Sequence, residues 1–231
     1  MIGKNENNSL IVLTSIFFIN AVLEISAEYF QFKWIIYVTK PLIPIILMVL
    51  YWVSSAVKNR LFFLTLFFSV ITNLLFIPKN EMFLFYGILA FTIHRIILLY
   101  YVYKTVKVRS YKLFVLCTIP LLTIFIYLLI ESYYLPANSI PILILQIFLI
   151  GIFGGIAVSE YILEDSKQSS YLMICALLFI ALQLVIFIEK YFLKSVTIEA
   201  LRPIAMSLNV IAFYSFYKFI IASEEKKLNN D

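Results

Sequence analysis

Eight apolar segments follow one another along the chain, each bounded by charged or turn-forming residues. They cover approximately residues 9–29, 35–56, 61–77, 82–103, 113–130, 140–163, 170–189 and 199–222. A helix needs about 20 apolar residues to cross the hydrocarbon core of a bilayer, and the segments lack the two-residue polar alternation of a membrane barrel. The pattern therefore predicts an all-α integral membrane protein, built as a bundle of eight transmembrane helices.

The composition agrees with this fold and excludes several classes of function. Hydrophobic residues make up 63% of the 231-residue chain and charged residues only 13%, whereas about a quarter of the residues in a soluble domain are charged. Eight spans leave only short connections, so we expect residues 1–231 to form a single polytopic transmembrane domain. A water-soluble enzyme, a nucleic-acid-binding protein and a secreted disulfide scaffold are therefore excluded.

The distribution of Lys and Arg predicts the orientation of the bundle. Ten of them fall on the side that holds both termini, namely Lys4, Lys58, Arg60, Lys104, Lys107, Arg109, Lys112, Lys167, Lys226 and Lys227. Four fall on the opposite side, namely Lys33, Lys79, Lys190 and Lys194. Because basic residues concentrate in cytoplasmic loops, we expect both termini in the cytoplasm and an integral, multi-pass protein of the cell membrane, specifically a bacterial inner membrane.

Three of the five glycines stand together in the sixth segment, in the run Gly151-Ile-Phe-Gly154-Gly155. Gly151, Gly155 and Ser159 share one helical face at four-residue spacing, a pattern that lets two helices approach closely. Packing against another helix of the same chain is the favoured interpretation. A homodimer through Gly151 and Gly155 is the alternative.

Polar side chains gather in the outer half of the predicted bundle, away from the termini. Glu24 and Glu28 share one face of the first segment, and Lys40 is followed by Pro41, which suits the first turn of the second helix. The other members of this set are Asn73, His94, Arg95, Gln183, Arg202 and Asn209. Ionisable groups within a span are costly unless paired or hydrated. The asymmetry therefore indicates a polar pocket open to the outer leaflet, in which acidic and basic side chains neutralise one another.

The alternative is that charged side chains near helix ends only extend toward the membrane interface. This explains Glu28, Glu189 and Lys40, but not the polar groups that lie deeper. Among those, His94 is the single histidine of the chain and is able to titrate near neutral pH. A histidine that makes only a structural hydrogen bond is the commoner case, so a catalytic and a structural role both stay open.

The chain offers no pattern for a metal site. One histidine and two separated cysteines, Cys117 and Cys175, do not supply the ligand spacing of a zinc or iron centre. We therefore expect neither a metal nor a cofactor.

Five short segments occur in a recognisable order. They are Lys40-Pro41, Ser69-Val-Ile-Thr-Asn73-Leu-Leu, Gly87-Ile-Leu-Ala-Phe91-Thr-Ile-His94, Ala176-Leu-Leu-Phe-Ile-Ala-Leu-Gln183 and Phe213-Tyr214-Ser-Phe-Tyr-Lys218. In layout they resemble, over nearly the whole chain, the YhhN-like family of eight-helix membrane proteins, which includes the lysoplasmalogenases. The family has Lys-Pro, Ser-x-x-Gly-Asp-x-Leu-Leu, Gly-x-x-x-Phe ending in histidine, a segment ending in Ser-Asp, and Tyr-Tyr-x-x-Gln at these places.

Two departures from the family pattern bear on function. The spacing in the fourth segment is one residue short, so Arg95 is an alternative to His94 at the family's histidine position. The two family aspartates correspond to Asn73 and Gln183. An amide has neither a usable proton nor a negative charge at neutral pH, so these two side chains can position water or a head group but cannot act as acid or base.

The resemblance implies hydrolysis of the vinyl ether bond of a lysoplasmalogen, which gives a fatty aldehyde and a glycerophospho head group. This reaction needs an acid that protonates the enol-ether carbon and a base that directs water onto the resulting cation. Without the aspartates, the acid would be Glu24, Glu28 or His94. Lys40 and Arg202 would then hold the phosphate.

Three functions stay open at this point. The first is a lysoplasmalogenase-type hydrolase, the second a non-catalytic relative that binds a lysolipid, and the third a small lipid transporter. The partner in each case is a membrane lipid or lysolipid. The candidate catalytic residues are Asn73, Gln183, His94 and Glu24. The candidate substrate-binding residues are Lys40, Arg202, Arg95, Glu28 and Tyr214.

Overall fold

The chain folds into a bundle of helices. The computed structural model describes residues 4–78, 80–106, 108–132, 139–193 and 200–228, and throughout these ranges the regular structure is helical. The helices are α1 (Lys4–Tyr29), α2 (Lys33–Ser54), α3 (Arg60–Leu75), α4 (Glu81–Thr105), α5 (Tyr111–Ile130), α6 (Ile140–Leu163), α7 (Lys167–Tyr191) and α8 (Leu201–Leu228). The all-α fold and the eight predicted helices are confirmed.

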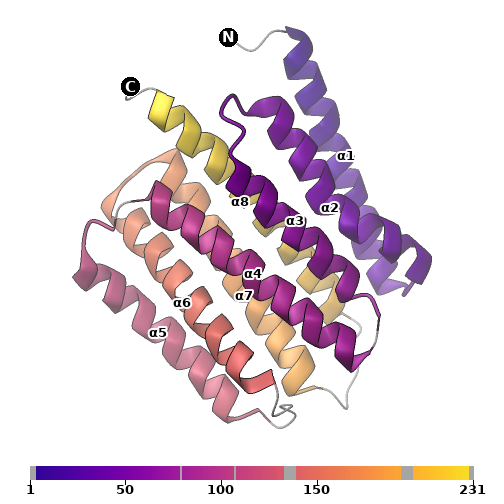
Figure 1. Ribbon diagram of the computed structural model, residues 1–231, viewed down its shortest axis with the longest axis vertical. Coiled ribbons are helices and arrows are strands. Elements are labelled where there is room, and N and C mark those ends of the chain that lie inside the picture. Colours follow the sequence, from indigo (N-terminus) through magenta and orange to yellow (C-terminus); the bar gives the residue numbers. More distant parts are fainter. Residues whose placement is uncertain (1–3, 79, 107, 133–138, 194–199, 229–231) are drawn as a thin grey trace.

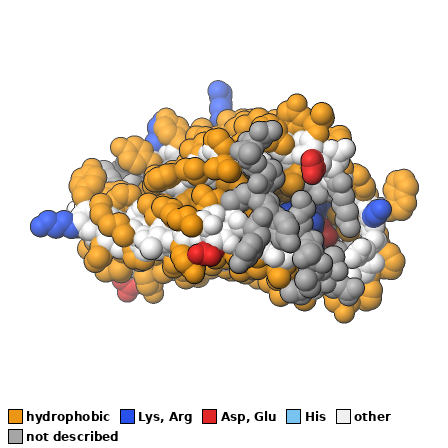
Figure 2. Space-filling view, turned by 90° about the horizontal axis from the view of Figure 1, so that it is seen from below, with side chains coloured by type: hydrophobic (Ala, Val, Ile, Leu, Met, Phe, Trp, Pro, Cys, Tyr) orange, Lys and Arg blue, Asp and Glu red, His pale blue; other side chains and the backbone are white. Residues whose placement is uncertain are grey.

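Seven of the helices are long and apolar enough to cross a membrane, whereas α3 is shorter, with 16 residues. Large hydrophobic side chains cover much of the outer surface, and Trp34 is 87% exposed. Figure 2, seen from the end away from the termini, shows hydrophobic side chains over most of the described surface with isolated charged groups between them. Such a surface is far more apolar than that of a soluble monomer.

Successive helices pack as pairs, α1 with α2, α3 with α4, α5 with α6 and α7 with α8. Figure 1 shows that both ends of the chain lie at the same end of the bundle. Helix α8 also packs against α1 and α2, while α5 lies at the edge and packs chiefly against α6. The predicted site residues belong to α1–α4, α7 and α8.

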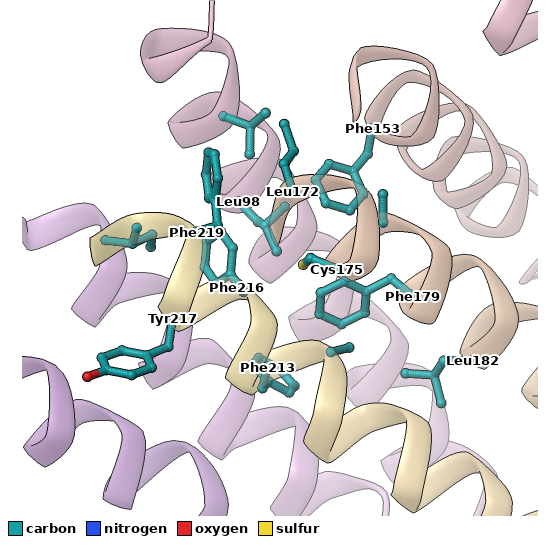
Figure 3. Close-up of a cluster of buried hydrophobic side chains, with 14 of the residues drawn as sticks. Leu98, Phe153, Leu172, Cys175, Phe179, Leu182, Phe213, Phe216, Tyr217 and Phe219 are labelled. Atoms are coloured by element: carbon teal, nitrogen blue, oxygen red, sulfur yellow. The ribbon is translucent and has the colours of Figure 1, made fainter. Parts of the chain in front are cut away.

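A cluster of aromatic and aliphatic side chains joins α4, α6, α7 and α8 (Figure 3). Phe179 of α7 meets Phe213 of α8 with ring centroids 5.5 Å apart and Phe153 of α6 at 6.2 Å. Leu98 of α4 is buried in the same cluster. This packing fixes the rotation of the four helices and with it the direction of their polar side chains.

Polar residues between the apolar segments cap several of the helices. The side chains of Asn59, Asn80 and Ser166 accept hydrogen bonds from backbone N–H groups in the first turns of α3, α4 and α7, as N-cap residues do. Residues 133–138, between the fifth and sixth apolar segments, lie outside the described residues. Of the basic residues used to predict orientation, Lys79, Lys107 and Lys194 also lie outside them.

The position of Pro41 differs from the prediction. Helix α2 begins at Lys33, so Pro41 and Pro44 both lie inside the helix and not in its first turn. Proline is tolerated inside a membrane helix when other groups satisfy the carbonyls that it leaves without a donor. Lys40 consequently lies well inside the helix, where its side chain is buried.

The glycine face of α6 is occupied by α5 of the same chain. A Cβ atom added to Gly155 would lie 1.9 Å from Thr118 Oγ1, and one added to Gly151 would lie 2.5 Å from Leu122 Cδ2. The favoured interpretation of these glycines, close packing inside one chain, is what the structure has. The homodimer stays a prediction.

Candidate functional site

A buried ion pair joins α1 to α2 in the half of the bundle away from the termini. Lys40 Nζ lies 2.6 Å from Glu28 Oε1, and the two side chains are 3% and 9% exposed. The alternative interpretation required these helix-end charges to extend to the membrane interface. Neither side chain reaches the surface. Breaking such a pair by removing one partner is strongly unfavourable, because it leaves a buried charge uncompensated.

Glu24 lies one turn from Glu28 on α1 and is completely buried, with 0% exposure. Neither of its carboxyl oxygens has a hydrogen-bond partner among the described residues. Lys40 and Glu28 are close enough to act on it electrostatically. The group contains one cation and two carboxyl groups, so it is electrically balanced when Glu24 carries a proton.

Two amides complete this group by binding the backbone of α2. Asn73 Nδ2 donates to the Lys40 carbonyl oxygen at 3.0 Å, and Asn20 Nδ2 donates to the Thr39 carbonyl oxygen at 2.9 Å. The Lys40 carbonyl would accept from the backbone nitrogen four residues later, but Pro44 has no N–H. Asn73 supplies the missing donor. We refer to Asn20, Glu24, Glu28, Lys40 and Asn73 as the outer cluster.

His94 lies deeper, between α3, α7 and α8. Its Nδ1 is 2.8 Å from the Thr65 carbonyl oxygen. A carbonyl only accepts, so Nδ1 carries the proton and Nε2 of the neutral ring presents a lone pair. The Nε2 atom is buried without a partner. The ring stacks on Phe91 and contacts Phe213, with centroids 5.7 and 5.3 Å apart.

Arg95 is buried beside His94 and binds the seventh helix. Its Nη2 donates to Gln183 Oε1 at 2.7 Å, and its guanidinium carbon lies 4.3 Å from the centre of the Phe91 ring. Nη1 has no partner in the described part of the chain. We refer to His94, Arg95 and Gln183 as the central cluster.

A small cavity of about 10 Å³ adjoins the central cluster. Its lining comprises His94, Arg95, Leu98, Leu149, Ile150, Phe153 and Phe179. Of the predicted site residues, only His94 and Arg95 contribute to it. The two clusters contact α3 at Asn73 and Thr65, eight residues apart, which corresponds to about 12 Å along the helix axis. The predicted polar groups therefore form two clusters at different depths.

Two further predicted residues lie elsewhere. Arg202 was expected to share charge with Glu24 and Glu28, but its Nε is paired with Glu189 Oε1 at 2.5 Å, between α8 and α7. Tyr214 packs against α1, with its ring centroid 5.6 Å from that of Phe17. Arg202 pairs with Glu189 because α7 and α8 are neighbours along the chain and adjacent in the bundle.

Three of the buried polar residues not predicted from the sequence make notable contacts. Asn20 belongs to the outer cluster, and Gln146 Nε2 donates to Thr92 Oγ1 at 3.1 Å beside the central cluster. Glu224, near the opposite end of the bundle, accepts hydrogen bonds from Tyr51 at 2.5 Å and Ser55 at 2.6 Å. An amide inside an apolar segment was a usable signal for Asn20 and Gln146. Glu224 was missed because the eighth segment was ended at residue 222, before the helix ends.

The chemistry available to the two clusters differs. In the outer cluster a buried carboxyl group with free oxygens can hold, release and regain a proton. In the central cluster a guanidinium group, an amide and a neutral imidazole can bind a ligand, but the nearby positive charge disfavours any reaction that creates a cation. The outer cluster is thus the candidate site for acid catalysis.

Comparison with known proteins gives one match. Residues 35–220 match the YhhN family, so the match covers most of the chain and includes α3–α7 completely. No curated protein and no solved structure matches the chain.

Proposed function

Because the chain belongs to the YhhN family, we propose that it is a lysoplasmalogenase-type hydrolase, which cleaves the vinyl ether bond of a lysolipid. We further propose that it is an integral, multi-pass protein of a bacterial inner membrane with both termini in the cytoplasm. Seven apolar helices of sufficient length and a surface rich in exposed hydrophobic side chains support insertion in a bilayer. The excess of Lys and Arg on the side of the termini supports the orientation.

The observation that carries the proposal is Glu24, a fully buried carboxyl group with both oxygens unpartnered beside the Lys40–Glu28 ion pair. A carboxyl group without a hydrogen-bond partner in a low-dielectric setting favours its neutral, proton-bearing form. That is the form that a general acid needs. The family pattern has aspartates elsewhere, whereas the candidate acid of this chain lies on α1.

The single carboxyl group of Glu24 can serve as both the acid and the base of this reaction. The Glu24 proton adds to the double-bond carbon that does not bear the ether oxygen, and the oxygen-bearing carbon becomes part of an oxocarbenium ion. The carboxylate that remains stabilises this cation and accepts a proton from water as the water oxygen attacks. The hemiacetal that forms then collapses to the fatty aldehyde and the free hydroxyl of the glycerophospho product.

The cations of the outer end are proposed contacts for the head group. Lys40 and Arg202 now each bind a carboxylate, on Glu28 and Glu189. A lipid phosphate would take the place of the carboxylate, since both are oxyanions that accept from the same N–H donors. Lys40 has the advantage that it lies next to the proposed acid.

A hydrolysis assay with a matched pair of variants tests the proposal. Purified protein in detergent is given a lysoplasmalogen, and the released aldehyde is measured. Glu24→Gln keeps the size of the side chain and removes its proton, so we expect at least a 100-fold loss of rate, within the range for general acid–base groups. Glu131→Gln makes the same change at an exposed position and should leave the rate unchanged. No aldehyde above a lipid-only control from the unmodified protein would refute the proposal.

One observation favours a second candidate, a non-catalytic relative that binds a lysolipid. The two amides at the family's aspartate positions are engaged in holding helices together, Asn73 with the Lys40 carbonyl and Gln183 with Arg95. In that case the same preparation would bind the lysolipid saturably without releasing aldehyde. Measuring binding by tryptophan fluorescence or by equilibrium dialysis alongside the aldehyde assay separates the two functions.

A further inference from the structure

Arg95 differs from the other buried basic side chain in the charge of its partner. Within the described ranges, Lys40 and Arg95 are the buried Lys and Arg residues. Lys40 is paired with the carboxylate of Glu28, whereas Arg95 donates to Gln183, a neutral amide. No ion pair of Arg95 occurs in the described residues. Arg95 therefore brings a positive charge into the bundle without a compensating negative charge.

Two residues with an unpartnered polar atom line the same cavity. Arg95 Nη1 and His94 Nε2 lack hydrogen-bond partners, and both residues line the cavity of about 10 Å³. His94 is 0% exposed and Arg95 6%. The rest of the lining is apolar and includes Leu98, Phe153 and Phe179, which Figure 3 shows in the surrounding hydrophobic cluster. The volume is that of about one water molecule, which leaves no room for a phosphate or a carboxylate group.

We propose that Arg95 and His94 form a binding site for a single monatomic anion of the size of chloride. A water molecule bound there would satisfy the Nη1 donor but would leave the positive charge uncompensated. A halide satisfies both requirements, because it accepts the Nη1 hydrogen bond and carries the missing charge. This inference does not depend on the hydrolase proposal, which concerns the outer cluster.

The anion enters together with a proton. Since Nδ1 of His94 donates to the Thr65 carbonyl, Nε2 of the neutral ring presents a lone pair, which repels an anion. A proton from solvent on Nε2 turns it into a second donor to the halide. The groups that face the ring are the Thr65 carbonyl of α3, Phe91 and Arg95 of α4, Phe179 of α7 and Phe213 of α8. Arg95 is the charged one among them, so the halide also shields the protonated ring from it.

Thermal stability in two salts tests the site. The purified, full-length protein is melted in detergent in sodium gluconate and in sodium chloride at the same ionic strength. A ligand that binds only the folded state raises the melting temperature, and a near-saturated single site should raise it by roughly 2–5 °C in a chain of this size. Equal melting temperatures in the two salts would overturn the proposal, because the site would then hold water only.

Two glutamine–glutamate exchanges on α7 provide the matched variants. Gln183→Glu places a carboxylate at the oxygen that already accepts from Arg95, so it supplies the missing charge permanently. We expect this variant to melt above the unmodified protein in gluconate and to lose the response to chloride. Glu189→Gln instead frees Arg202, a partly exposed arginine, and should keep the full response. A chloride response that persists in Gln183→Glu would show a general salt effect and overturn the proposal.

Proton uptake tests the part assigned to His94. Chloride is added to the concentrated protein in an unbuffered solution near neutral pH, and the pH is followed against a gluconate addition. We expect uptake of up to one proton per chain, and none in the Gln183→Glu variant. A chloride-dependent rise in melting temperature without proton uptake would overturn the role of His94 in the site.

Discussion

Asn73 on α3 donates its side-chain N–H to the backbone carbonyl of Lys40 on α2, at 3.0 Å. This carbonyl has no helical donor, because the residue four positions later is Pro44. The amide thus replaces a backbone hydrogen bond and fixes the turn of α2 from which the Lys40 side chain reaches Glu28. The family pattern has an aspartate at this position, and an ionised aspartate has no hydrogen to donate.

Restoring the family's aspartate at this position should therefore harm the protein. In Asn73→Asp, a carboxylate faces the Lys40 carbonyl, and a buried acceptor loses its donor. We expect a loss of about 1–3 kcal/mol in the free energy of unfolding and no gain in hydrolysis. Chemical denaturation in detergent measures the first and the aldehyde assay the second.

Two further variants show whether the loss arises from the missing donor. Asn80→Asp makes the same exchange at the N-cap of α4, where aspartate serves as well as asparagine, and should be nearly neutral. Pro44→Ala returns the backbone N–H to α2, so Asn73→Asp should cost less in that background. A rise in hydrolysis rate in Asn73→Asp would contradict this account and would mean that the position is still catalytic.

The sequence predicted the helices well because long apolar runs bounded by polar turns leave few alternatives in a bilayer. The predictions were wrong where a local signal, such as a proline or a charged residue, conflicts with packing between helices. Pro41 was assigned to a first turn, but α2 begins at Lys33 and contains both prolines, and Asn73 of α3 supplies the donor that Pro44 lacks. The eighth segment was ended at residue 222, whereas α8 continues to Leu228 because Glu224 is satisfied by Tyr51 and Ser55.

The polar residues of the site were predictable, but their partners were not. Polar groups in apolar segments are conspicuous, and Glu24, Lys40, His94 and Arg95 are all buried. Which of them meet depends on the rotation of each helix, which is set by contacts such as Phe179 with Phe213. Sequence spacing does not encode that rotation, so one shared pocket was predicted where the structure has two clusters.

The buried Lys40–Glu28 pair predicts a characteristic pattern of stability. Glu28→Gln removes the carboxylate that pairs with Lys40, and within the outer cluster that charge can be replaced only if buried Glu24 gives up its proton, so we expect a loss of up to about 3–5 kcal/mol in the free energy of unfolding. Combining it with Lys40→Met removes both charges and should recover most of that loss. Denaturant titration of the two single variants and the double variant measures the coupling. Additive losses would mean that the two side chains do not interact in the folded protein.

The two ion pairs of Glu164, at the end of the bundle that holds the termini, should make the stability of the protein depend on pH. It accepts from Lys226 of α8 and is also paired with Arg109, and the bond from Lys226 is the main reason that the pKa of its carboxyl group is lowered from the ordinary value of 4.5. A lowered folded pKa gives stability that is complete above pH 4.5 and is lost as the pH falls through the folded value. The protein should therefore melt at a lower temperature below that pH.

The variant Glu164→Gln separates this contribution from general acid sensitivity. At neutral pH it should cost at most about 1 kcal/mol per ion pair, because both basic partners are partly exposed. Its melting temperature should then fall less steeply than that of the unmodified protein between about pH 5 and 3. Glu225→Gln, at an exposed position on α8, serves as the control and should keep the original slope. Parallel slopes for Glu164→Gln and the unmodified protein would show that the two ion pairs do not contribute.

The contact between α5 and α6 predicts an effect of Gly155 on folding. A Cβ atom at Gly155 would lie 1.9 Å from Thr118 Oγ1, so Gly155→Val forces α5 away from α6 and should cost about 1–3 kcal/mol, as overpacking does. Thr118→Ala removes the obstructing hydroxyl, and Gly155→Ala should be better tolerated in that background than in the unmodified chain. If the glycine face is used inside one chain, these variants lower the melting temperature without changing the mass of the detergent-solubilised particle. A change in that mass, measured by light scattering, would instead assign Gly155 to a homodimer interface.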